Sequence, residues 1–268
     1  MFKLVSHRFS VFALSFVLLL NALIGYPNVA HAGKTKSFAL DPSSKVVNVV
    51  AIYETSLEAQ EDVIDALKAS KSIKKAPGFN GFSILKSEDG DRVVALSQWQ
   101  DLESYEAYNA TPVEESKSAK DKKKKDIVAI APTRTMVFEI EKAQAMKDGI
   151  IPTIRGKEAV VQLSDFSLKS PDDQTTVLAS VEKTIPGVLQ QQPTPQSVIL
   201  MKSTDSKDVA LLANWNCGAE FEDLGKPAAF EQPSDVASLA DNDQHLYDVV
   251  KIISADKKFK GSKGKSDD

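Results

Sequence analysis

The sequence is poor in the residues that build most metal, disulfide and nucleophile sites. Cys217 is the only cysteine in 268 residues, so no disulfide can form within the chain. There are three histidines, and no Gly-rich phosphate loop, Cys-x-x-Cys pair or His-Glu-x-x-His motif is present. These absences give no support to a nucleotide-dependent enzyme or a metalloenzyme. We therefore expect no metal and no cofactor.

The first 32 residues have the three-part layout of a secretory signal peptide. Lys3 and Arg8 precede an apolar run at 11–25, and a small-residue site ends at Ala32. An apolar run of 15 residues is shorter than the roughly 20 needed to cross a bilayer, which disfavours the alternative of a retained membrane anchor. We expect cleavage after Ala32 and a secreted or periplasmic protein.

The charge balance argues against a nucleic-acid-binding protein. The formal net charge of -4 becomes -6 when Lys3 and Arg8 leave with the signal peptide, and a mildly acidic chain is repelled by phosphate backbones. Two Lys-rich segments, 117–126 and the tail 256–268, could contact anionic lipid or polyphosphate. Such runs are more often solvated loops and disordered ends, and we expect the tail to be disordered.

The rest of the chain contains the same pattern of elements twice. Trp99 and Trp215 end equivalent strands at an offset of 116 residues. The outer strands of the two copies align at an offset of 112: 46–54 with 158–166, and 135–143 with 247–255. The differences in offset fall in connections, as a duplication predicts, because loops tolerate insertions. We expect one repeat at 45–143 and a second, degenerate repeat at 158–255.

A helix is expected after the first strand of each copy. Residues 55–58 form a capping box in the first copy, and Ser170 followed by Pro171 is a cap in the second. Pro-Gly pairs at 77–78 and 186–187 are expected to end these helices. The apolar residues at helical spacing are Leu57, Val63, Ile64 and Leu67 in the first copy, and Val177, Leu178, Val181 and Ile185 in the second.

Two strands, a second helix and a last strand complete each copy. The two strands are joined at 88–91, where Asp-Gly indicates a hairpin, and at 204–207 in the second copy. The order β-α-β-β-α-β is that of a ferredoxin-like unit, whose antiparallel sheet has helices on one face only. We predict an α+β fold in which the two repeats press their bare faces together and form a pseudo-dimeric α+β barrel. The protein would be a monomer or a loose homo-oligomer.

Three segments of the first copy occur in a specific combination: "APGFNGFSIL" at 76–85, "VVALSQW" at 93–99 and "QDLESYEAY" at 100–108. Together they resemble the antibiotic biosynthesis monooxygenase (ABM) family of dimeric α+β barrels, here duplicated in tandem. The resemblance implies oxygen-dependent oxidation of aromatic or quinol-like molecules, often without metal or flavin, in a pocket between sheet and helices. Haem-degrading members carry a His on the second helix. No His occurs at 105–120, so haem breakdown is not expected.

Aromatic and hydroxyl side chains of the first copy form the candidate site. Trp99 could stack on a planar ligand, and the phenols of Tyr105 and Tyr53 could handle protons, so these three are the candidate catalytic residues. The candidate substrate-binding residues are Ser97, Tyr108, Asn48 and Phe82. The second copy replaces the tyrosines with Phe166, Phe221 and Leu224. The hydroxyls are therefore dispensable for packing. The simpler alternative is that Trp99 is a core residue and that the tyrosines are structural.

Two further positions are judged by strand alternation and by comparison of the copies. Ser97 and Trp99 share a face of their strand and Gln98 points away, which favours Ser97 as a pocket residue. His245 is the only histidine after the signal peptide, and its match in the first copy is Thr133. A surface or strand-edge histidine is therefore expected.

Two functions follow from these observations. The first is an exported ABM-like, cofactor-independent monooxygenase that acts on a small hydrophobic aromatic or quinol-like molecule bound in the first repeat. The alternative is an exported, non-catalytic small-molecule-binding or stress-associated protein that keeps the barrel. Neither function involves nucleic acid or a stable membrane anchor.

Overall fold

The computed structural model describes residues 36–70, 72–110 and 130–254. The expected signal peptide, the Lys-rich segment 117–126 and the tail 256–268 lie outside these residues. Within the described ranges, no helix combines the length and the apolar character that a membrane span requires.

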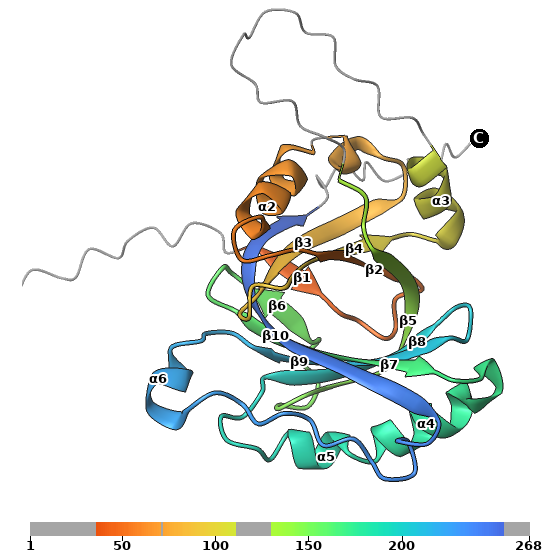
Figure 1. The fold of residues 1–268 in the computed structure, drawn as a ribbon, viewed down its shortest axis with the longest axis vertical. Helices are drawn as coiled ribbons and strands as arrows, with labels where there is room; N and C mark the ends of the chain where they lie inside the picture. The colour runs from red at the N-terminus through yellow and green to blue at the C-terminus, as the bar shows by residue number, and fades with distance from the viewer. Residues whose placement is uncertain (1–35, 71, 111–129, 255–268) are drawn as a thin grey trace, which may run out of the picture. The chain divides into compact units, whose positions relative to one another are not determined.

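Both repeats contain the predicted order of strands and helices (Figure 1). The first repeat consists of β2 (Val47–Glu54), α2 (Gln60–Ala69), the 3-10 helix η1 (Ile73–Lys75), β3 (Phe79–Ser87), β4 (Arg92–Trp99), α3 (Leu102–Ala110) and β5 (Arg134–Ala145). The second consists of β7 (Val160–Leu168), the 3-10 helix η2 (Pro171–Asp173), α4 (Gln174–Glu182), α5 (Ile185–Val188), β8 (Ser197–Ser203), β9 (Asp208–Trp215), α6 (Glu220–Leu224) and β10 (Ala240–Ser254). Two short strands, β1 (Ser37–Ala39) and β6 (Thr153–Arg155), pair with each other outside this pattern.

The eight long strands form one closed antiparallel barrel in the order β10-β3-β4-β2-β5-β8-β9-β7. The last strand of each repeat pairs with the second strand of the other, β5 with β8 and β10 with β3. Helices α2 and α3 lie outside the barrel on the side of the first repeat, and α4 and α5 lie on the opposite side (Figure 1). This arrangement confirms the predicted pseudo-dimeric α+β barrel.

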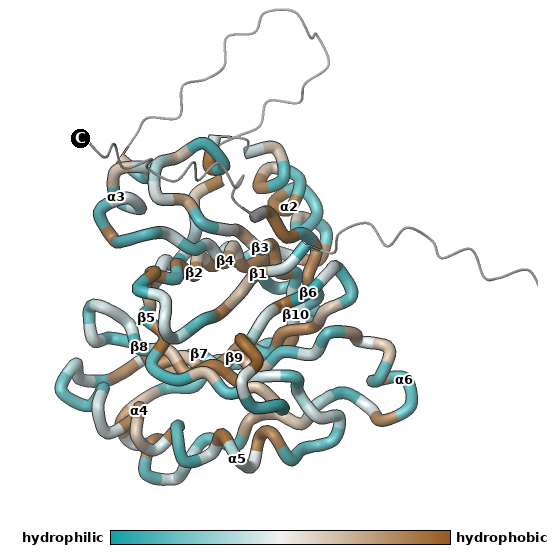
Figure 2. The backbone as a smooth tube through the Cα atoms, turned by 180° about the vertical axis from the view of Figure 1, so that it is seen from behind, coloured by the Kyte–Doolittle hydropathy of each residue, from teal (hydrophilic) through white to brown (hydrophobic). Residues whose placement is uncertain are grey.

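The barrel interior is an apolar core that both repeats share. Val50, Leu96 and Phe138 of the first repeat meet Leu163 and Leu212 of the second, and all five are at least 95 % buried. Alternate strand residues point outward, where each repeat has a separate core beneath its own helices. In Figure 2 the hydrophobic stretches follow the strands, whereas the outer loops are mostly hydrophilic. Neither sheet could leave its inner face in water, so the repeats depend on each other.

A short ribbon that the sequence did not predict closes one end of the barrel. Phe38 of β1 and Ile154 of β6 are buried and belong to the interior core. The Phe38 ring lies over Gly81 so closely that a Cβ at this glycine would stand 3.3 Å from two ring carbons. The first repeat therefore uses Phe38 to fill the interior at its end of the barrel.

Two local helix predictions are wrong. Helix α2 begins at Gln60 rather than at the capping box of 55–58, and Leu57 is 69 % exposed. The buried amide of Gln60 fixes this start, because its Nε2 donates to the carbonyl oxygens of Ser87 (3.0 Å) and Arg92 (2.9 Å) in the β3–β4 hairpin. The second Pro-Gly pair lies inside the one-turn helix α5 and does not turn the chain into β8.

Strand pairing also corrects the alignment of the repeats. Phe138 faces Asn48 on the neighbouring strand, just as Tyr247 faces Val161 in the other repeat. Tyr247 is thus the counterpart of Phe138, at an offset of 109 residues rather than 112, and both lie in the barrel interior. The counterpart of His245 is then Met136 instead of Thr133. Burial of one face fixes the register of these strands more strongly than sequence similarity does.

Candidate functional site

An aromatic cluster surrounds Trp99 between the outer face of the first-repeat sheet and α3. Trp99 ends β4 and is fully buried. Its ring centroid lies 5.6 Å from that of Phe79, 5.8 Å from Tyr105 and 5.1 Å from Tyr108. Tyr105 and Tyr108 come from α3, three residues apart and hence on one helix face. The "WQDLESYEAY" segment thus makes a strand end and a helix meet around one indole.

Hydroxyl groups accompany the aromatic rings of this cluster. Trp99 Nε1 donates to Ser97 Oγ at 3.0 Å, which confirms that Ser97 and Trp99 share a face. The Tyr108 hydroxyl lies 3.3 Å from Ser72 Oγ. Burial, helped by the nearby phenols of Tyr105 and Tyr108, raises the pKa of Tyr53 to about 12. The predicted residues Ser97, Trp99, Tyr105 and Tyr108 are thus brought together. Tyr53 faces Val93 rather than Trp99 across the strands, and it joins the group only through its proximity to the phenols of Tyr105 and Tyr108.

The raised phenol pKa values determine what this cluster can do chemically. Burial also raises the pKa of Tyr105, against the opposing effect of a hydrogen bond with Thr135. Both Tyr53 and Tyr105 therefore stay protonated at neutral pH. They can donate hydrogen bonds to an anionic oxygen, but they cannot act as bases there.

The two remaining predicted residues have different positions. Phe82 packs in the same outer core as Trp99. Asn48 lies on the other face of the sheet, because its pairing with Gln98 turns both side chains into the barrel, where Gln98 Nε2 donates to Asn48 Oδ1 at 3.0 Å. The structure therefore separates Asn48 from the Trp99 cluster.

Helix α3 covers the cluster. It has no fully buried residue, and its contact with the sheet is made by half-buried side chains such as Tyr105, Tyr108 and Ser104. It packs on the turn at Gly78, where a Cβ would stand 2.3 Å from Ser104 Oγ. Because no part of Trp99 is exposed, a ligand can stack on this ring only if α3 moves outward.

The second repeat has the same packing without the hydroxyls. Trp215 is buried, its ring centroid lies 5.7 Å from that of Phe221, and its Nε1 donates to the carbonyl oxygen of Pro193 at 3.1 Å. Phe166 and Val209 pair across β7 and β9 as Tyr53 and Val93 pair across β2 and β4. Phe166 is thus the counterpart of Tyr53. The fold can be built with or without the phenols.

A second polar group, which sequence reasoning missed, lies at the end of the barrel opposite to β1 and β6. Arg134 contacts the buried carboxylates of Asp165 and Asp208, and Arg92 contacts Asp243. Each of these ion pairs joins the first repeat to the second. Arg92 and Asp208 begin the equivalent strands β4 and β9, and strand pairing makes Asp243 the counterpart of Arg134. The two repeats thus exchange the signs of their charges.

Burial and neighbouring charges shift the pKa values of this ionic group. Burial raises the pKa of Asp165 to about 7, despite the opposing Arg134, and it also raises the pKa of Asp208. For Asp89, hydrogen bonds from Ser87, the Asp91 amide and His245 outweigh burial and lower the pKa to about 2.

His245 belongs to this ionic group. Its Nδ1 lies 2.5 Å from Asp89 Oδ2 and its Nε2 lies 3.0 Å from Asp243 Oδ1. Its side chain is 15 % exposed. The sequence predicted a surface or strand-edge histidine. His245 lies where β10 pairs with β7 and not yet with β3, and it is held between two carboxylates at the barrel end. No described group of His, Cys, Asp and Glu side chains is arranged to hold a metal ion.

The fold and the Trp99 cluster define a class of protein: a tandem pair of ferredoxin-like units closed into one α+β barrel, with an aromatic cluster between sheet and helices. Residues 46–115 match the family described as antibiotic biosynthesis monooxygenase. The first repeat therefore belongs to the ABM family, and the chain is a tandem duplicated barrel of this family's type.

One of the similar solved structures shows the same fold. A structure of an anthrone oxidase-like protein has a TM-score of 0.62 at 16 % identity, over 83 % of this chain and 98 % of that one. A proposed monooxygenase from Fusobacterium nucleatum has a TM-score of 0.47 at 11 % identity, over 78 % of this chain and 94 % of that one. One from Lactobacillus acidophilus has a TM-score of 0.43 at 11 % identity, over 78 % and 95 %. No curated protein matches the chain.

Proposed function

We propose that the first repeat binds a small, planar, electron-rich aromatic or quinol-like molecule against Trp99, beneath α3, and promotes its oxidation by dioxygen without a cofactor. One observation supports this proposal above the others. In the first repeat the rings of Tyr105 and Tyr108 and the hydroxyl of Ser97 contact Trp99, and the phenol of Tyr53 lies near the other two phenols. The second repeat achieves the same packing with Phe166 and Phe221. Hydroxyls that packing does not require are available for binding or catalysis.

The protonated phenols give the proposed mechanism. A substrate that has lost a proton to water carries negative charge on a ring oxygen, and Tyr53 and Tyr105 would donate hydrogen bonds to that oxygen. In a site shielded from water such donors stabilise the anion strongly. The electron-rich anion then reacts with dioxygen. A methylene flanked by two rings loses two hydrogens and becomes a carbonyl, which takes one oxygen atom, and the other oxygen atom leaves as water.

The family match supports the chemistry in general terms, and the fold neighbour supplies a probe. Anthrone has a methylene of this kind. Menadiol is a compact quinol, which instead transfers two hydrogens to dioxygen and gives the quinone and hydrogen peroxide. With either compound, we expect oxygen uptake above the rate in buffer. Tyr53→Phe should lower the rate about 100-fold, because removal of one proton donor or oxyanion donor typically costs this much. An oxygen electrode with product analysis measures both effects.

The control is Tyr247→Phe, which removes a buried phenol outside the Trp99 cluster. This variant should keep the wild-type rate, and circular dichroism should show that both variants are folded. The triple variant of Tyr53, Tyr105 and Tyr108 to Phe makes the first repeat resemble the second, and it should lose the activity. A Tyr53→Phe rate equal to wild type would show that the phenols play no part.

The complete burial of Trp99 favours a second function, that of a non-catalytic binding protein that keeps the barrel. The same compounds distinguish it from the first. A shift of the Trp99 indole N–H signal without oxygen uptake would support binding alone, and neither effect would contradict both functions.

Export is part of either proposal and is motivated by the signal-like pattern of residues 1–32. The N-terminal sequence of the mature protein tests it. A start at Gly33 would support export, and a start at Met1 would contradict it.

A further inference from the structure

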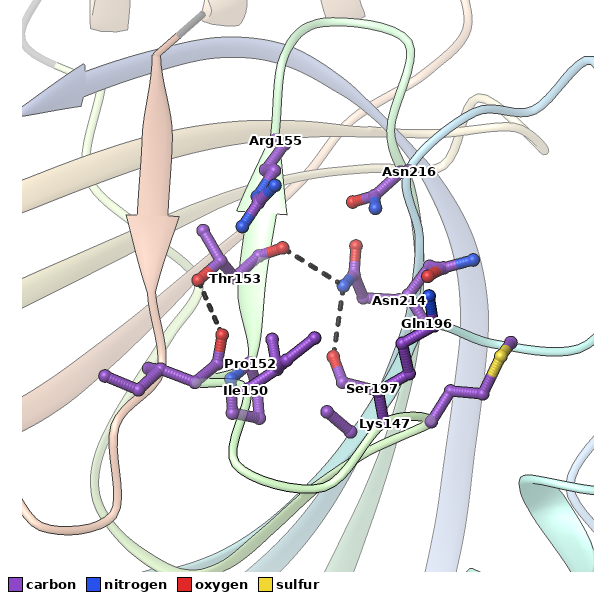
Figure 3. A pocket seen from close by; sticks show the side chains of 12 residues that line it. Lys147, Ile150, Pro152, Thr153, Arg155, Gln196, Ser197, Asn214 and Asn216 are labelled. Carbon is purple, nitrogen blue, oxygen red and sulfur yellow. Dashed lines mark hydrogen bonds between the residues drawn. The ribbon is translucent and has the colours of Figure 1, made fainter.

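A cavity of about 160 Å³ lies at the end of the barrel that carries β1 and β6, away from the Trp99 cluster. Residues 145–147 and 150–152, strand β6 and the adjoining ends of β8 and β9 line it. Figure 3 shows Thr153, Ser197 and Asn214 together at its base, with Arg155 and Asn216 beside them. Neither the sequence motifs nor the proposed oxidation accounts for this cavity.

Asn214 gives the cavity a hydrogen-bond acceptor that lacks a donor. Its side chain is buried, and its Nδ2 donates to Ser197 Oγ at 3.1 Å and to the carbonyl oxygen of Thr153 at 3.4 Å. A carbonyl can only accept, so the amide nitrogen must face Thr153 and Oδ1 must face the other way. Asn214 Oδ1 has no hydrogen-bond partner among the described atoms. A buried acceptor without a donor is costly, and a ligand hydroxyl would satisfy it.

The outer part of the cavity is cationic and apolar. Arg155 and Lys147 are exposed and line it, and none of its described lining residues is acidic. Met146, Ile150 and Ile151 also line it, although they are 46 %, 49 % and 50 % exposed. Large apolar side chains that are this exposed, next to polar residues at the bottom of a cavity, are typical of a binding site rather than of a core.

The first repeat fills the corresponding place with its own side chains. Gln98 is the counterpart of Asn214, and its Nε2 is satisfied by the Ala39 carbonyl oxygen at 2.7 Å and by Asn48 Oδ1 at 3.0 Å. Gly81 pairs with Gln98 as Ser197 pairs with Asn214, and the ring of Phe38 covers Gly81. The second repeat has the shorter amide, a serine in place of the glycine, and a cavity in place of the ring.

We propose that this cavity binds a small hydroxy acid. The hydroxyl donates to Asn214 Oδ1, the carboxylate meets Arg155 and Lys147, and a short apolar or aromatic body lies against Ile150 and Ile151. The volume equals that of about five waters at roughly 30 Å³ each. It therefore admits a single ring and excludes the larger ring systems proposed for the Trp99 cluster.

Titration of the ¹⁵N-labelled protein with three matched compounds tests the proposal. The compounds are 4-hydroxybenzoate, benzoate, which lacks the hydroxyl, and 4-hydroxybenzyl alcohol, which lacks the charge. We expect 4-hydroxybenzoate to shift the side-chain amide signals of Asn214 and to leave the Trp99 indole signal in place. Its affinity should exceed that of each other compound about tenfold, since each leaves one polar group of the site unsatisfied.

Two variants locate the binding site. Arg155→Gln should weaken 4-hydroxybenzoate about tenfold and leave 4-hydroxybenzyl alcohol unaffected. Lys157→Gln is the matched control, since Lys157 is two residues away and does not line the cavity. Equal affinities for the three compounds, shifts confined to Trp99, or no saturable binding at millimolar concentrations would each overturn the proposal.

Discussion

Replacing Arg134 with Met should lower the free energy of unfolding by about 3 kcal/mol, the lower end of the range for breaking a buried ion pair. Arg134 is the partner of both Asp165 and Asp208, whose side chains are only 5 % and 7 % exposed. At about pH 8, where Asp165 is ionised, removal of the guanidinium would leave two carboxylates facing each other in the barrel without a counter-charge. The lower end applies because the Arg134 side chain itself is 36 % exposed. Urea denaturation followed by circular dichroism measures the loss.

A matched control separates burial from charge. Lys142 also joins the repeats, through Glu182 on α4, but the two side chains are 44 % and 42 % exposed. Lys142→Met should cost less than about 1 kcal/mol, as exposed ion pairs do. Adding Asp165→Asn and Asp208→Asn to Arg134→Met should restore most of the lost stability. Equal costs for Arg134→Met and Lys142→Met would contradict the role given to the buried carboxylates.

The second large effect is a pH dependence that originates at Asp165. Its pKa is about 7 in the folded protein, against 3.8 for the ordinary side chain, because burial disfavours its charged form. The charges that act on it are Arg134, Asp208 and Asp243, from three different strands. Between these two pKa values the folded protein holds a proton that the unfolded chain has released. Stability from this group is therefore lost as the pH rises, and the loss is complete above about pH 7.

Comparison of the wild type with Asp165→Asn isolates this contribution, since asparagine stays neutral throughout. Between about pH 5 and pH 8 the variant should gain on the order of 3 kcal/mol relative to the wild type, from about two pKa units at roughly 1.4 kcal/mol each. Denaturation at a series of pH values measures the difference. Asp62→Asn, on the exposed face of α2, reports the effect of removing one negative charge. Parallel profiles for wild type and Asp165→Asn would contradict the assignment.

Much of the fold could be predicted because it depends on signals that are local or repeated. The hairpins at 88–91 and 204–207 and the two tryptophans lie where the sequence indicated. Closure of the barrel followed from a physical need, since each ferredoxin-like sheet has one face without helices. The start of α2 could not be read, because the buried side chain of Gln60 determines it through contacts with a distant hairpin.

The site could be predicted only in part. Adjacent segments supply Trp99, Tyr105 and Tyr108, so their meeting was visible in the sequence. The ionic group was not, because its members come from five strands and from the 88–91 hairpin, which only the barrel register brings together. Inward-facing charges such as Asp165 and Asp208 were a usable signal, since alternation within apolar strands would have placed them inside. Asn48 was misjudged for the reverse reason, since pairing with Gln98 decides its face.

The central claim is that the two repeats form one barrel with one shared core, and the chain provides a reporter for each half. It contains two tryptophans, Trp99 in the outer core of the first repeat and Trp215 in that of the second. Their indole N–H signals can be followed together through a urea titration of the wild-type protein. Our account predicts that both native signals disappear with the same midpoint, because neither half can keep its inner face buried alone. Loss of one signal at a clearly lower urea concentration, while the other persists, would show that the halves fold separately and would contradict the account.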